Sequence, residues 1–427
     1  MSTRTAPALA LHGGQPVRTR PFPPRPGLGD SERRAVERVL ASGELSRFIG
    51  AWGPDFAGGP NVRSLEAAWA ERFGARHAVS MNSATSALNA AVAAAGAGPG
   101  DEVITSPYTM SASATCALVN GAIPVFADIE PETFCVDPES VRERITPRTK
   151  AIVAVDIFGC PANWAALRAI AAEHDLTLIE DAAQAPGGAH PLGPAGTLGH
   201  IGVFSLNYHK TIQCGEGGVA VTDDDVLAER LALARNHGEV VVDDMGSEQI
   251  DVLGFNYRMG ELEAAIAEAQ LERLDELTEP RIAHAARLTE GLADLEGVQP
   301  PLTPDGYRHV FYLYVVRLDA ATLGVSRARF AAALRAEGVP VTEGYVRPIY
   351  REPLYRRRAA APFADPRNEG SGSYGDGLCP TCERMHDEEV LFHPFVHAGL
   401  SDADVDDIAA AFRKVHSRRH ELAQWSP

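Results

Sequence analysis

Between residues 64 and 223, short apolar runs alternate with segments of helical character. The apolar runs lie at 103–104, 123–126, 151–155, 176–179, 203–206 and 219–221. The helical segments lie near 64–73, 83–95, 112–120, 138–145 and 163–174. Strands that alternate with helices predict an α/β fold with a mainly parallel sheet covered on both faces. Such sheets bind ligands at the carboxyl ends of their strands, so polar residues that follow a strand are the first site candidates.

The rest of the chain predicts an N-terminal arm and a second domain. Residues 1–30 are rich in proline and glycine, Asp30 or Ser31 caps a helix that runs to about Ala41, and Gly43–Gly59 is irregular. A long helical region covers Gly260 to about Leu295, and we expect Pro280 to interrupt it. Beyond it we expect an alternating strand, two helices and a loop-like stretch, at Val310–Arg317, 326–336, 402–416 and 359–378. We therefore predict an arm (1–30), a large domain (31–280) and a smaller C-terminal α/β domain (281–427).

Charge and composition exclude several classes of protein. The formal net charge of -18 argues against a nucleic-acid partner, because such proteins carry basic patches. No stretch approaches the roughly 18 apolar residues of a membrane span, and Met1–Arg20 lacks the apolar run of a signal peptide. Six cysteines scattered over 427 residues do not resemble a disulfide framework. We expect a protein of the reducing cytoplasm, with no membrane partner.

Two segments predict an anion site and a carboxylate at the edge of the sheet. Asn82–Leu88 places small hydroxyl residues at the start of a helix, where free N–H groups and the helix dipole can hold a phosphate. Taken alone, this segment is more typical of a plain N-cap than of a phosphate site. Leu176–Ile179 is an apolar strand that leads into Glu180-Asp181-Ala182-Ala183-Gln184. Asp181 has the chemistry to keep a pyridine nitrogen protonated, with Gln184 close by, although an aspartate also commonly closes a strand.

Two further segments complete the pattern. The strand Val203–Leu206 leads through Asn207-Tyr208-His209 to Lys210 and then to a glycine-rich turn at Gly215–Gly218. A lysine between rigid elements is positioned as a Schiff-base amine must be, although most lysines are simply solvated. Gly254-Phe255-Asn256-Tyr257-Arg258-Met259 precedes a helix, and its Asn256 and Arg258 are either phosphate ligands or part of an exposed helix-entry loop.

From about Ser31 to the C-terminus, these four segments in order resemble the DegT/DnrJ/EryC1/StrS family of sugar aminotransferases, which use pyridoxal 5'-phosphate (PLP). The resemblance implies the aspartate-aminotransferase type I fold. It also implies that Ala84, Thr85 and Ser205 hold the phosphate, Asp181 pairs with the pyridine nitrogen and Gln184 approaches the ring oxygen. Lys210 is then the lysine that forms the internal aldimine. Asn256 or Arg258 would arrive from the partner subunit of a homodimer with shared active sites.

The chain departs from the family pattern at two places. Where many members stack an aromatic ring on the cofactor, the corresponding residue is Met110, whose thioether can pack on a ring, with Tyr108 as the alternative. The C-terminal region, which contains Cys379-Pro-Thr-Cys382 and Phe392-His393-Pro394, also differs from the commonest pattern.

The C-terminal region offers one candidate metal site and one candidate substrate site. Cys379 and Cys382, with His386 beyond them, lack a second ligand pair, so we favour ordinary cysteines over zinc ligands and expect no metal. Family members use the stretch that contains Tyr345, Arg347 and Tyr350 at the substrate mouth, and we add these residues and Tyr108 as substrate candidates. A core strand that ends at a proline explains the stretch equally well.

The resemblance implies that glutamate or glutamine donates an amino group to a keto sugar or keto cyclitol. The Gly13-Gly14-Gln15-Pro16-Val17-Arg18 arm and the Gly43–Gly59 insertion resemble members from aminocyclitol and other natural-product pathways, such as antibiotic biosynthesis. A PLP-dependent sugar dehydratase of the same family is the alternative, but dehydratases of deoxysugar formation generally carry histidine in place of Lys210. A DNA-binding regulator would need a basic helix-turn-helix, and an NAD-dependent oxidoreductase would need a G-x-G-x-x-G segment. We find neither in the sequence.

Overall fold

A computed structural model describes residues 8–50, 53–238, 252–394, 396–423 and 425. Its main element is a seven-stranded sheet of order β1-β9-β8-β5-β4-β2-β3, in which β9 alone runs against the other strands. The strands are β1 (His77–Met81), β2 (Glu102–Thr105), β3 (Ile123–Phe126), β4 (Thr149–Val155), β5 (Thr177–Asp181), β8 (Ile201–Ser205) and β9 (Gly218–Thr222). The predicted α/β class with a mainly parallel sheet is confirmed.

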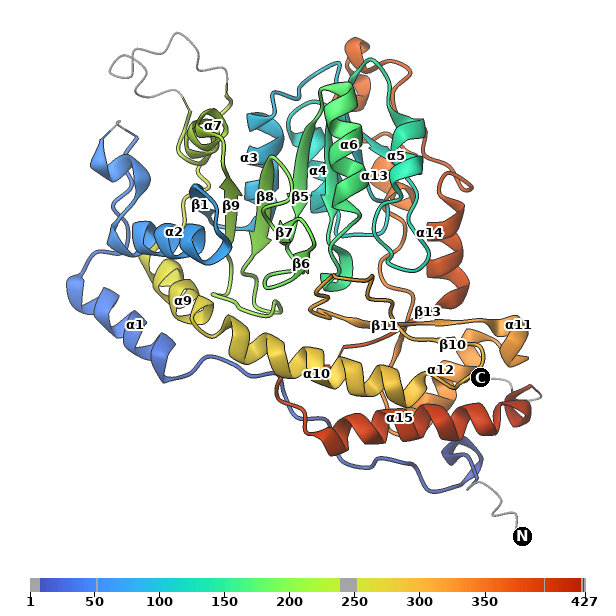
Figure 1. Cartoon of the computed structure of the whole chain (residues 1–427). Helices are drawn as coiled ribbons and strands as arrows, with labels where there is room; N and C mark the ends of the chain where they lie inside the picture. The colour runs from blue at the N-terminus through green and yellow to red at the C-terminus, as the bar shows by residue number, and fades with distance from the viewer. Residues whose placement is uncertain (1–7, 51–52, 239–251, 395, 424, 426–427) are drawn as a thin grey trace.

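Helices cover both faces of this sheet (Figure 1). They are α2 (Pro60–Phe73), α3 (Ala84–Ala94), α4 (Ala112–Val119), α5 (Pro138–Arg144), α6 (Trp164–His174) and α7 (Asp225–Arg235). Side chains of β4 alternate between two cores, because successive residues of a strand point to opposite faces. Ala151 and Val153 pack with α3, α4 and α7, whereas Ile152 and Ala154 pack with α6. Burial on both faces explains why β4 is apolar from Ala151 to Val155.

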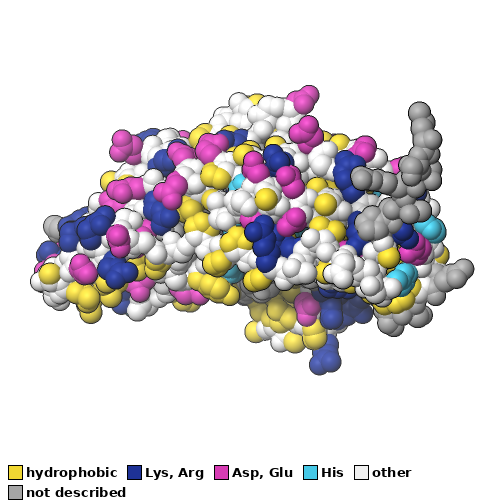
Figure 2. Space-filling view, turned by 90° about the horizontal axis from the view of Figure 1, so that it is seen from below, with side chains coloured by type: hydrophobic (Ala, Val, Ile, Leu, Met, Phe, Trp, Pro, Cys, Tyr) yellow, Lys and Arg dark blue, Asp and Glu magenta, His cyan; other side chains and the backbone are white. Residues whose placement is uncertain are grey.

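A second, antiparallel sheet of order β10-β11-β13-β12 lies toward the C-terminus. Its strands are β10 (Val298–Gln299), β11 (Tyr314–Leu318), β13 (Val390–His393) and β12 (Thr342–Glu343). It shares a core with the long helix α10 (Leu274–Leu292), with α12 (Arg327–Ala336) and with α15 (Asp402–Ser417). In Figure 1, α10 and α15 run below the sheets. Acidic, basic and hydrophobic side chains are interspersed over this underside, which Figure 2 shows.

The remaining elements are short or peripheral. They are α1 (Asp30–Ser42), α9 (Glu261–Leu271), α11 (Ala320–Leu323), α13 (Pro353–Arg356), α14 (Pro380–Arg384) and the hairpin of β6 (Ala189–His190) with β7 (Gly193–Pro194). Within the described ranges, no helix combines the length and the apolar character that crossing a membrane requires. The extended arm is fixed to the second core by Glu337, whose carboxylate accepts hydrogen bonds from the backbone of Ala10 (2.8 Å) and Val17 (3.0 Å) and from Lys414 Nζ (2.7 Å).

Two local predictions are wrong. Pro280 does not interrupt its helix but lies inside α10, and the break falls at Glu272–Arg273 between α9 and α10. A proline removes one helical hydrogen bond, and the buried face of α10 offsets that loss. The strand predicted from Val310 begins only at Tyr314, because Phe311 has a positive φ of 48° and Val310 donates its N–H to the carbonyl of Gly159 instead (3.0 Å).

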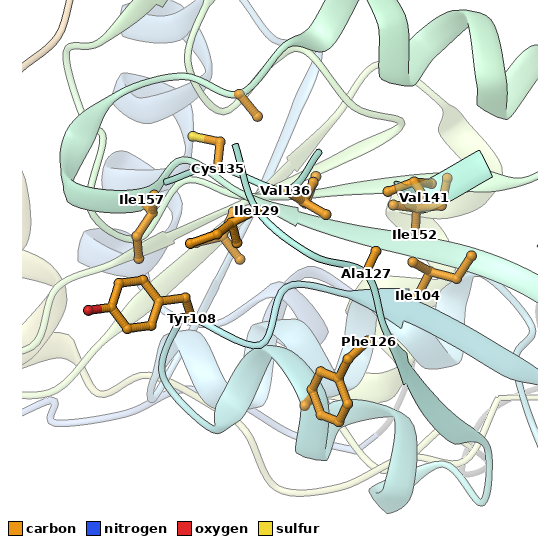
Figure 3. Packing of buried hydrophobic residues seen from close by; sticks show 14 of the residues in the cluster. Ile104, Tyr108, Phe126, Ala127, Ile129, Cys135, Val136, Val141, Ile152 and Ile157 are labelled. Atoms are coloured by element: carbon orange, nitrogen blue, oxygen red, sulfur yellow. The ribbon is translucent and has the colours of Figure 1, made fainter. Parts of the chain in front are cut away.

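The chain beyond residue 281 contributes to the core of the second sheet and also to one core of the large sheet. The predicted domain division falls inside α10, whose buried face packs with the second sheet. The later residues Tyr350, Tyr355, Phe363, Cys379 and Cys382 instead share a core with Phe126 of the large sheet. Figure 3 shows part of that core, with Phe126 and Tyr108 among its labelled side chains. The C-terminal third of the chain therefore covers the edge of the large sheet near β3.

Candidate active site

Six of the predicted site residues line one cavity of about 230 Å³ at the carboxyl edge of the large sheet. Strands β5 and β8 are parallel neighbours, so Asp181 and Ser205 end at the same edge. The N-terminus of α3 lies beside them, because it packs against Gly218 of β9, which pairs with Ser205. The predicted residues in the lining are Ala84, Thr85, Met110, Asp181, Ser205 and Lys210.

Lys210 is held in a tight loop between β8 and β9. Its backbone N–H donates to the carbonyl of Asn207 (2.9 Å), and Asn207 Nδ2 donates to Glu216 Oε1 (2.8 Å). The Nζ atom lies 4.8 Å from the centre of the Tyr312 ring. Burial lowers the pKa of Lys210 to about 8, and the nearby Asp181 carboxylate opposes that shift. A partly neutral amine at ordinary pH is the form that attacks a carbonyl group.

Asp181 is a buried carboxylate held by two neutral donors. Ser113 Oγ donates to its Oδ2 at 2.7 Å, and the Ala183 N–H donates to its Oδ1 at 3.1 Å. Burial raises the pKa of Asp181, while these hydrogen bonds and the positive charge of Lys210 oppose the rise. The carboxylate therefore has room for a further cationic partner, since no arginine or lysine hydrogen-bonds to it in the described part of the chain.

The N-terminus of α3 forms the third wall. Ser83 caps the helix, because its Oγ accepts from the Ser86 N–H at 3.1 Å. The first N–H groups of a helix have no acceptor within the helix, so those of Ala84 and Thr85 are available to an anion. Gly218 permits this approach, because a Cβ at that position would stand 2.4 Å from the Ala84 nitrogen. The wall combines helix N–H groups with the Ser205 hydroxyl, a donor set suited to a phosphate.

A buried amine with a lowered pKa, a buried carboxylate and a phosphate cradle thus surround one cavity. The model of the DegT/DnrJ/EryC1/StrS aminotransferase family matches residues 51–413. The chain belongs to this family.

Relatives of the chain in this aminotransferase family match over almost its whole length. The L-glutamine:2-deoxy-scyllo-inosose aminotransferase of Streptomyces kanamyceticus is 37% identical, over 97% of this chain and 98% of the relative. The L-glutamine:scyllo-inosose aminotransferase of Streptomyces griseus is 36% identical, over 98% and 99%. Among solved structures, DesI in the presence of its TDP-sugar product has a TM-score of 0.81 at 32% identity, with 97% of each chain covered. The predicted family, fold and enzyme class, a PLP-dependent aminotransferase, are confirmed.

The remaining family positions lie outside the cavity lining. Gln184 is buried behind Asp181, where its Oε1 accepts from the Phe158 N–H (2.7 Å) and its Nε2 donates to the Tyr345 hydroxyl (3.2 Å). Asn256 and Arg258 contact each other through Arg258 Nε and Asn256 Oδ1 (2.8 Å), on a loop next to Asn82 at the entry to α3. The side chains of Asn256 and Arg258 are therefore near the phosphate wall but do not line it in their own chain.

Three substrate candidates lie outside the lining of the cavity. Tyr108 is fully buried, and its hydroxyl accepts from the Tyr345 N–H at 3.0 Å, so Met110 and not Tyr108 faces the cavity. Tyr350 is also fully buried and donates to Glu383 Oε1 at 2.5 Å. Arg347 is exposed, with its Nε 3.8 Å from a carboxylate oxygen of Glu352. The structure thus corrects Tyr108 and Tyr350 to core residues, because aromatic side chains with a single polar atom fit a core when that atom has a partner.

Cys379 and Cys382 are buried in the core, where burial raises the pKa of both thiols. Over the described residues, no three His, Cys, Asp or Glu side chains are placed to hold a metal ion.

Two residues of the site, Ser113 and Tyr312, were not predicted from the sequence. Ser113 holds Asp181, and the only signal for it was a hydroxyl pair, Thr109 and Ser113, at helical spacing before an apolar helix. Tyr312 lies against Lys210, although its segment was predicted only as a strand of the C-terminal domain. Both contacts join segments more than 65 residues apart, so no local pattern reports them.

Proposed function

We propose that this aminotransferase moves an amino group from glutamine or glutamate to a keto cyclitol or keto sugar, with PLP held in the cavity beside Lys210. The observation that carries the proposal is the arrangement of Lys210 Nζ, the Asp181 carboxylate and the α3 N-terminus around one cavity. The printed names of the relatives support glutamine as donor and a keto cyclitol as acceptor. They also favour transamination over the dehydratase alternative.

The residues of the cavity fit this cofactor at three points. The N–H groups of Ala84 and Thr85 and the Ser205 hydroxyl would hold its phosphate, and Asp181 would accept from its ring nitrogen. Met110, about half exposed in the lining, would pack against the ring face. Ser113 would orient Asp181 through its 2.7 Å hydrogen bond. Gln184 would reach the ring oxygen only with a change of its contacts to Phe158 and Tyr345.

Bound PLP supplies an electron sink that stores the amino group between the two halves of the reaction. Lys210 Nζ would hold the cofactor and, once free, would remove the proton from the donor's α-carbon as a general base. Its lowered pKa favours the neutral form that both tasks need. Asp181 would keep the ring nitrogen protonated, and in the second half-reaction Lys210 would return a proton to the carbon that receives the amine.

The test is an assay of purified holoenzyme with glutamine and, separately, glutamate against a panel of free keto cyclitols and nucleotide-linked keto sugars. We expect amination of keto cyclitols with the wild type and none with Lys210→Ala. Borohydride reduction should fix the cofactor on Lys210 and on no other residue. Reduction onto another lysine, or full activity of Lys210→Ala, would disprove the assignment.

We also propose that the protein works as a homodimer with shared sites, in which Asn256 or Arg258 reaches the phosphate of the other chain. Leu28, Leu40 and Leu45 are each more than half exposed, which supports a covering partner for the N-terminal segment. The exposed Asn256 supplies a donor that its own cavity does not use. The six cysteines are all free and buried, which supports the reducing cytoplasm as the working compartment.

Mixing two inactive variants tests the shared site. A Lys210→Ala chain mixed with an Asn256→Ala, Arg258→Ala chain should regain about a quarter of wild-type activity, because random exchange gives half mixed dimers with one intact site each. A Lys210→Ala chain mixed with an Asp181→Asn chain is the matched control and should stay inactive. Lys210 and Asp181 of each site belong to the same chain, so every site of a mixed dimer lacks one of the two residues. Demonstrated subunit exchange without regained activity would show that the loop serves its own chain.

A further inference from the structure

Two arginines from distant parts of the chain contact the residues before and after Lys210. Arg25, in the N-terminal arm, donates from Nη1 to the carbonyl of His209 (2.6 Å) and from Nη2 to the carbonyl of Pro394 (3.0 Å). Arg281, on α10, donates from Nη1 to Thr211 Oγ1 (2.9 Å). Neither arginine lies in the four segments that carry the family resemblance, and the two guanidinium groups bring positive charge to both sides of the Lys210 segment.

Arg281 is buried without a carboxylate partner. It is 4% exposed, and its Nε has no hydrogen-bond partner among the described residues. Other buried arginines are paired: Arg18 lies 2.8 Å from Asp404, and Arg235 lies 2.5 Å from Glu66. The chain carries 57 acidic against 39 basic residues, so a protein carboxylate for Arg281 would be easy to supply. A buried unpaired charge is costly, which indicates that an anion from outside the chain completes this site.

The charges around Arg281 add to this indication. Burial, and after it the charge of Arg25, lowers the pKa of Arg281 to about 10, so it stays positive at neutral pH. His397 is 1% exposed beside both arginines, and its Nε2 also lacks a hydrogen-bond partner in the described structure. No ion pair with a carboxylate is formed by Arg25 or Arg281 in the described ranges. The positive charge of Arg25 thus acts on both Lys210 and Arg281, and Arg281 Nε and His397 Nε2 are left without hydrogen-bond partners in the described structure.

We propose that Arg281, assisted by Arg25, binds the α-carboxylate of the amino donor while its amine is at Lys210. This rests on the proposed transamination. In an α-amino acid, the carboxylate is bonded to the carbon that bears the amine, so a site that brings the amine to Lys210 must hold an anion close to that lysine. Guanidinium groups match a carboxylate in shape and charge. A keto cyclitol has no such anion, so these arginines act in the half-reaction with the amino donor and not in the half-reaction with the acceptor.

The first test compares the two half-reactions of the holoenzyme. Arg281→Gln should lower kcat/KM for L-glutamine by roughly 10- to 100-fold, mainly through KM, because it removes a hydrogen bond between charged groups. With L-glutaminamide, whose carboxylate is replaced by a carboxamide, the variant and the wild type should differ by less than about threefold. Transfer from the amino-loaded enzyme to the keto acceptor should not change. Arg142→Gln, which changes an exposed arginine paired with Glu173, is the matched control and should behave as wild type.

The second test measures carboxylate binding without any turnover. Glutarate, which has carboxylates but no amine, should bind the wild-type holoenzyme in calorimetry and bind Arg281→Gln at least about 10-fold more weakly. Arg281→Lys should recover part of the binding, and where Arg281→Gln proves too unstable to purify, Arg281→Lys and Arg25→Gln carry the comparison. Weakened glutarate binding in an enzyme that aminates no keto acceptor would refute the proposed function and retain the carboxylate site. Equal glutarate binding and equal KM for glutamine in wild type and Arg281→Gln would overturn the inference.

Discussion

Lys210 is expected to be partly neutral in the cofactor-free protein at a pH where an ordinary lysine is almost fully charged. Burial lowers its pKa from 10.5 to about 8. At pH 7.5 a group with that pKa is neutral in roughly a quarter of the molecules, against about 0.1% at 10.5, an enrichment of roughly 200-fold. Because the folded protein then binds fewer protons than the unfolded chain between pH 8 and 10.5, Lys210 also adds stability as the pH rises through that window.

The chain contains only three lysines, which makes this measurable. Trace labelling with acetic anhydride at a series of pH values, followed by peptide mass spectrometry, would give a reactivity profile for each. Lys150 is exposed and serves as the internal reference, and Lys414 is paired with Glu337 at 2.7 Å. The midpoint of the Lys210 profile, rather than its absolute rate, reports the pKa, because burial also slows access of the reagent.

Asp181→Asn supplies the perturbation that tests the cause. The Asp181 carboxylate opposes the shift by favouring the charged ammonium, so its removal should move the Lys210 midpoint below about 8. Asp181→Glu keeps the charge and should leave the midpoint near that of the wild type. A wild-type midpoint at or above pH 10, or a midpoint that rises in Asp181→Asn, would refute the account of burial opposed by a neighbouring carboxylate.

Three further changes have expected outcomes. Asp181→Asn in the holoenzyme should slow single-turnover transamination by at least about 100-fold, far more than Asp181→Glu, because an amide cannot balance a protonated ring nitrogen. Glu337→Gln should lower the free energy of unfolding in urea by about 3–5 kcal/mol, because it leaves the buried Lys414 ammonium without its carboxylate. Tyr350→Phe should cost about 1–2 kcal/mol of stability, through the lost hydrogen bond to Glu383, and leave both KM values unchanged.

For each of these three changes, one result would contradict the expectation. Near-wild-type turnover of Asp181→Asn would contradict the electron-sink role. Glu343→Gln, in a partly exposed ion pair with Arg335, is the control for Glu337→Gln and should cost less than about 1 kcal/mol. If both glutamate variants were equally stable, the buried pair would not anchor the arm. A raised KM for either substrate in Tyr350→Phe would show that Tyr350 contributes to substrate binding.

The sequence was informative where chemistry and fold lie in one continuous segment. The run from Val203 to Gly218 contains a buried strand, a lysine and a glycine turn, and the structure places the strand end, Ser205, and Lys210 in one cavity. The same holds for β5 and Asp181, because a polar residue after an apolar strand must lie at the edge of the sheet. Strand β1 was not predicted, because His77–Met81 has too little apolar character to indicate a buried strand.

Contacts between distant segments could not be predicted in this way. Tyr108 and Tyr350 have the composition of a substrate mouth, yet each hydroxyl finds a partner inside the core. Ser113, Tyr312 and Arg281 lie on segments that contain no motif, and only the folded chain brings them to Asp181, Lys210 and Thr211. A local pattern indicates on which face of a helix or strand a side chain lies, but not which residues it contacts in the folded chain.

The protonation states of the basic residues give a physical reason why the cofactor should attach at Lys210 alone. A carbonyl group reacts with a neutral amine, and a guanidinium group does not lose its proton in this range, so the many arginines of the chain are excluded. Lys414 is excluded by its buried ion pair with Glu337, and Lys150 is an exposed residue near the start of β4, outside the cavity lining. Lys210 combines a pKa lowered by burial with an open cavity at its Nζ. Arg25 strengthens the effect, since its positive charge further disfavours the ammonium form of Lys210.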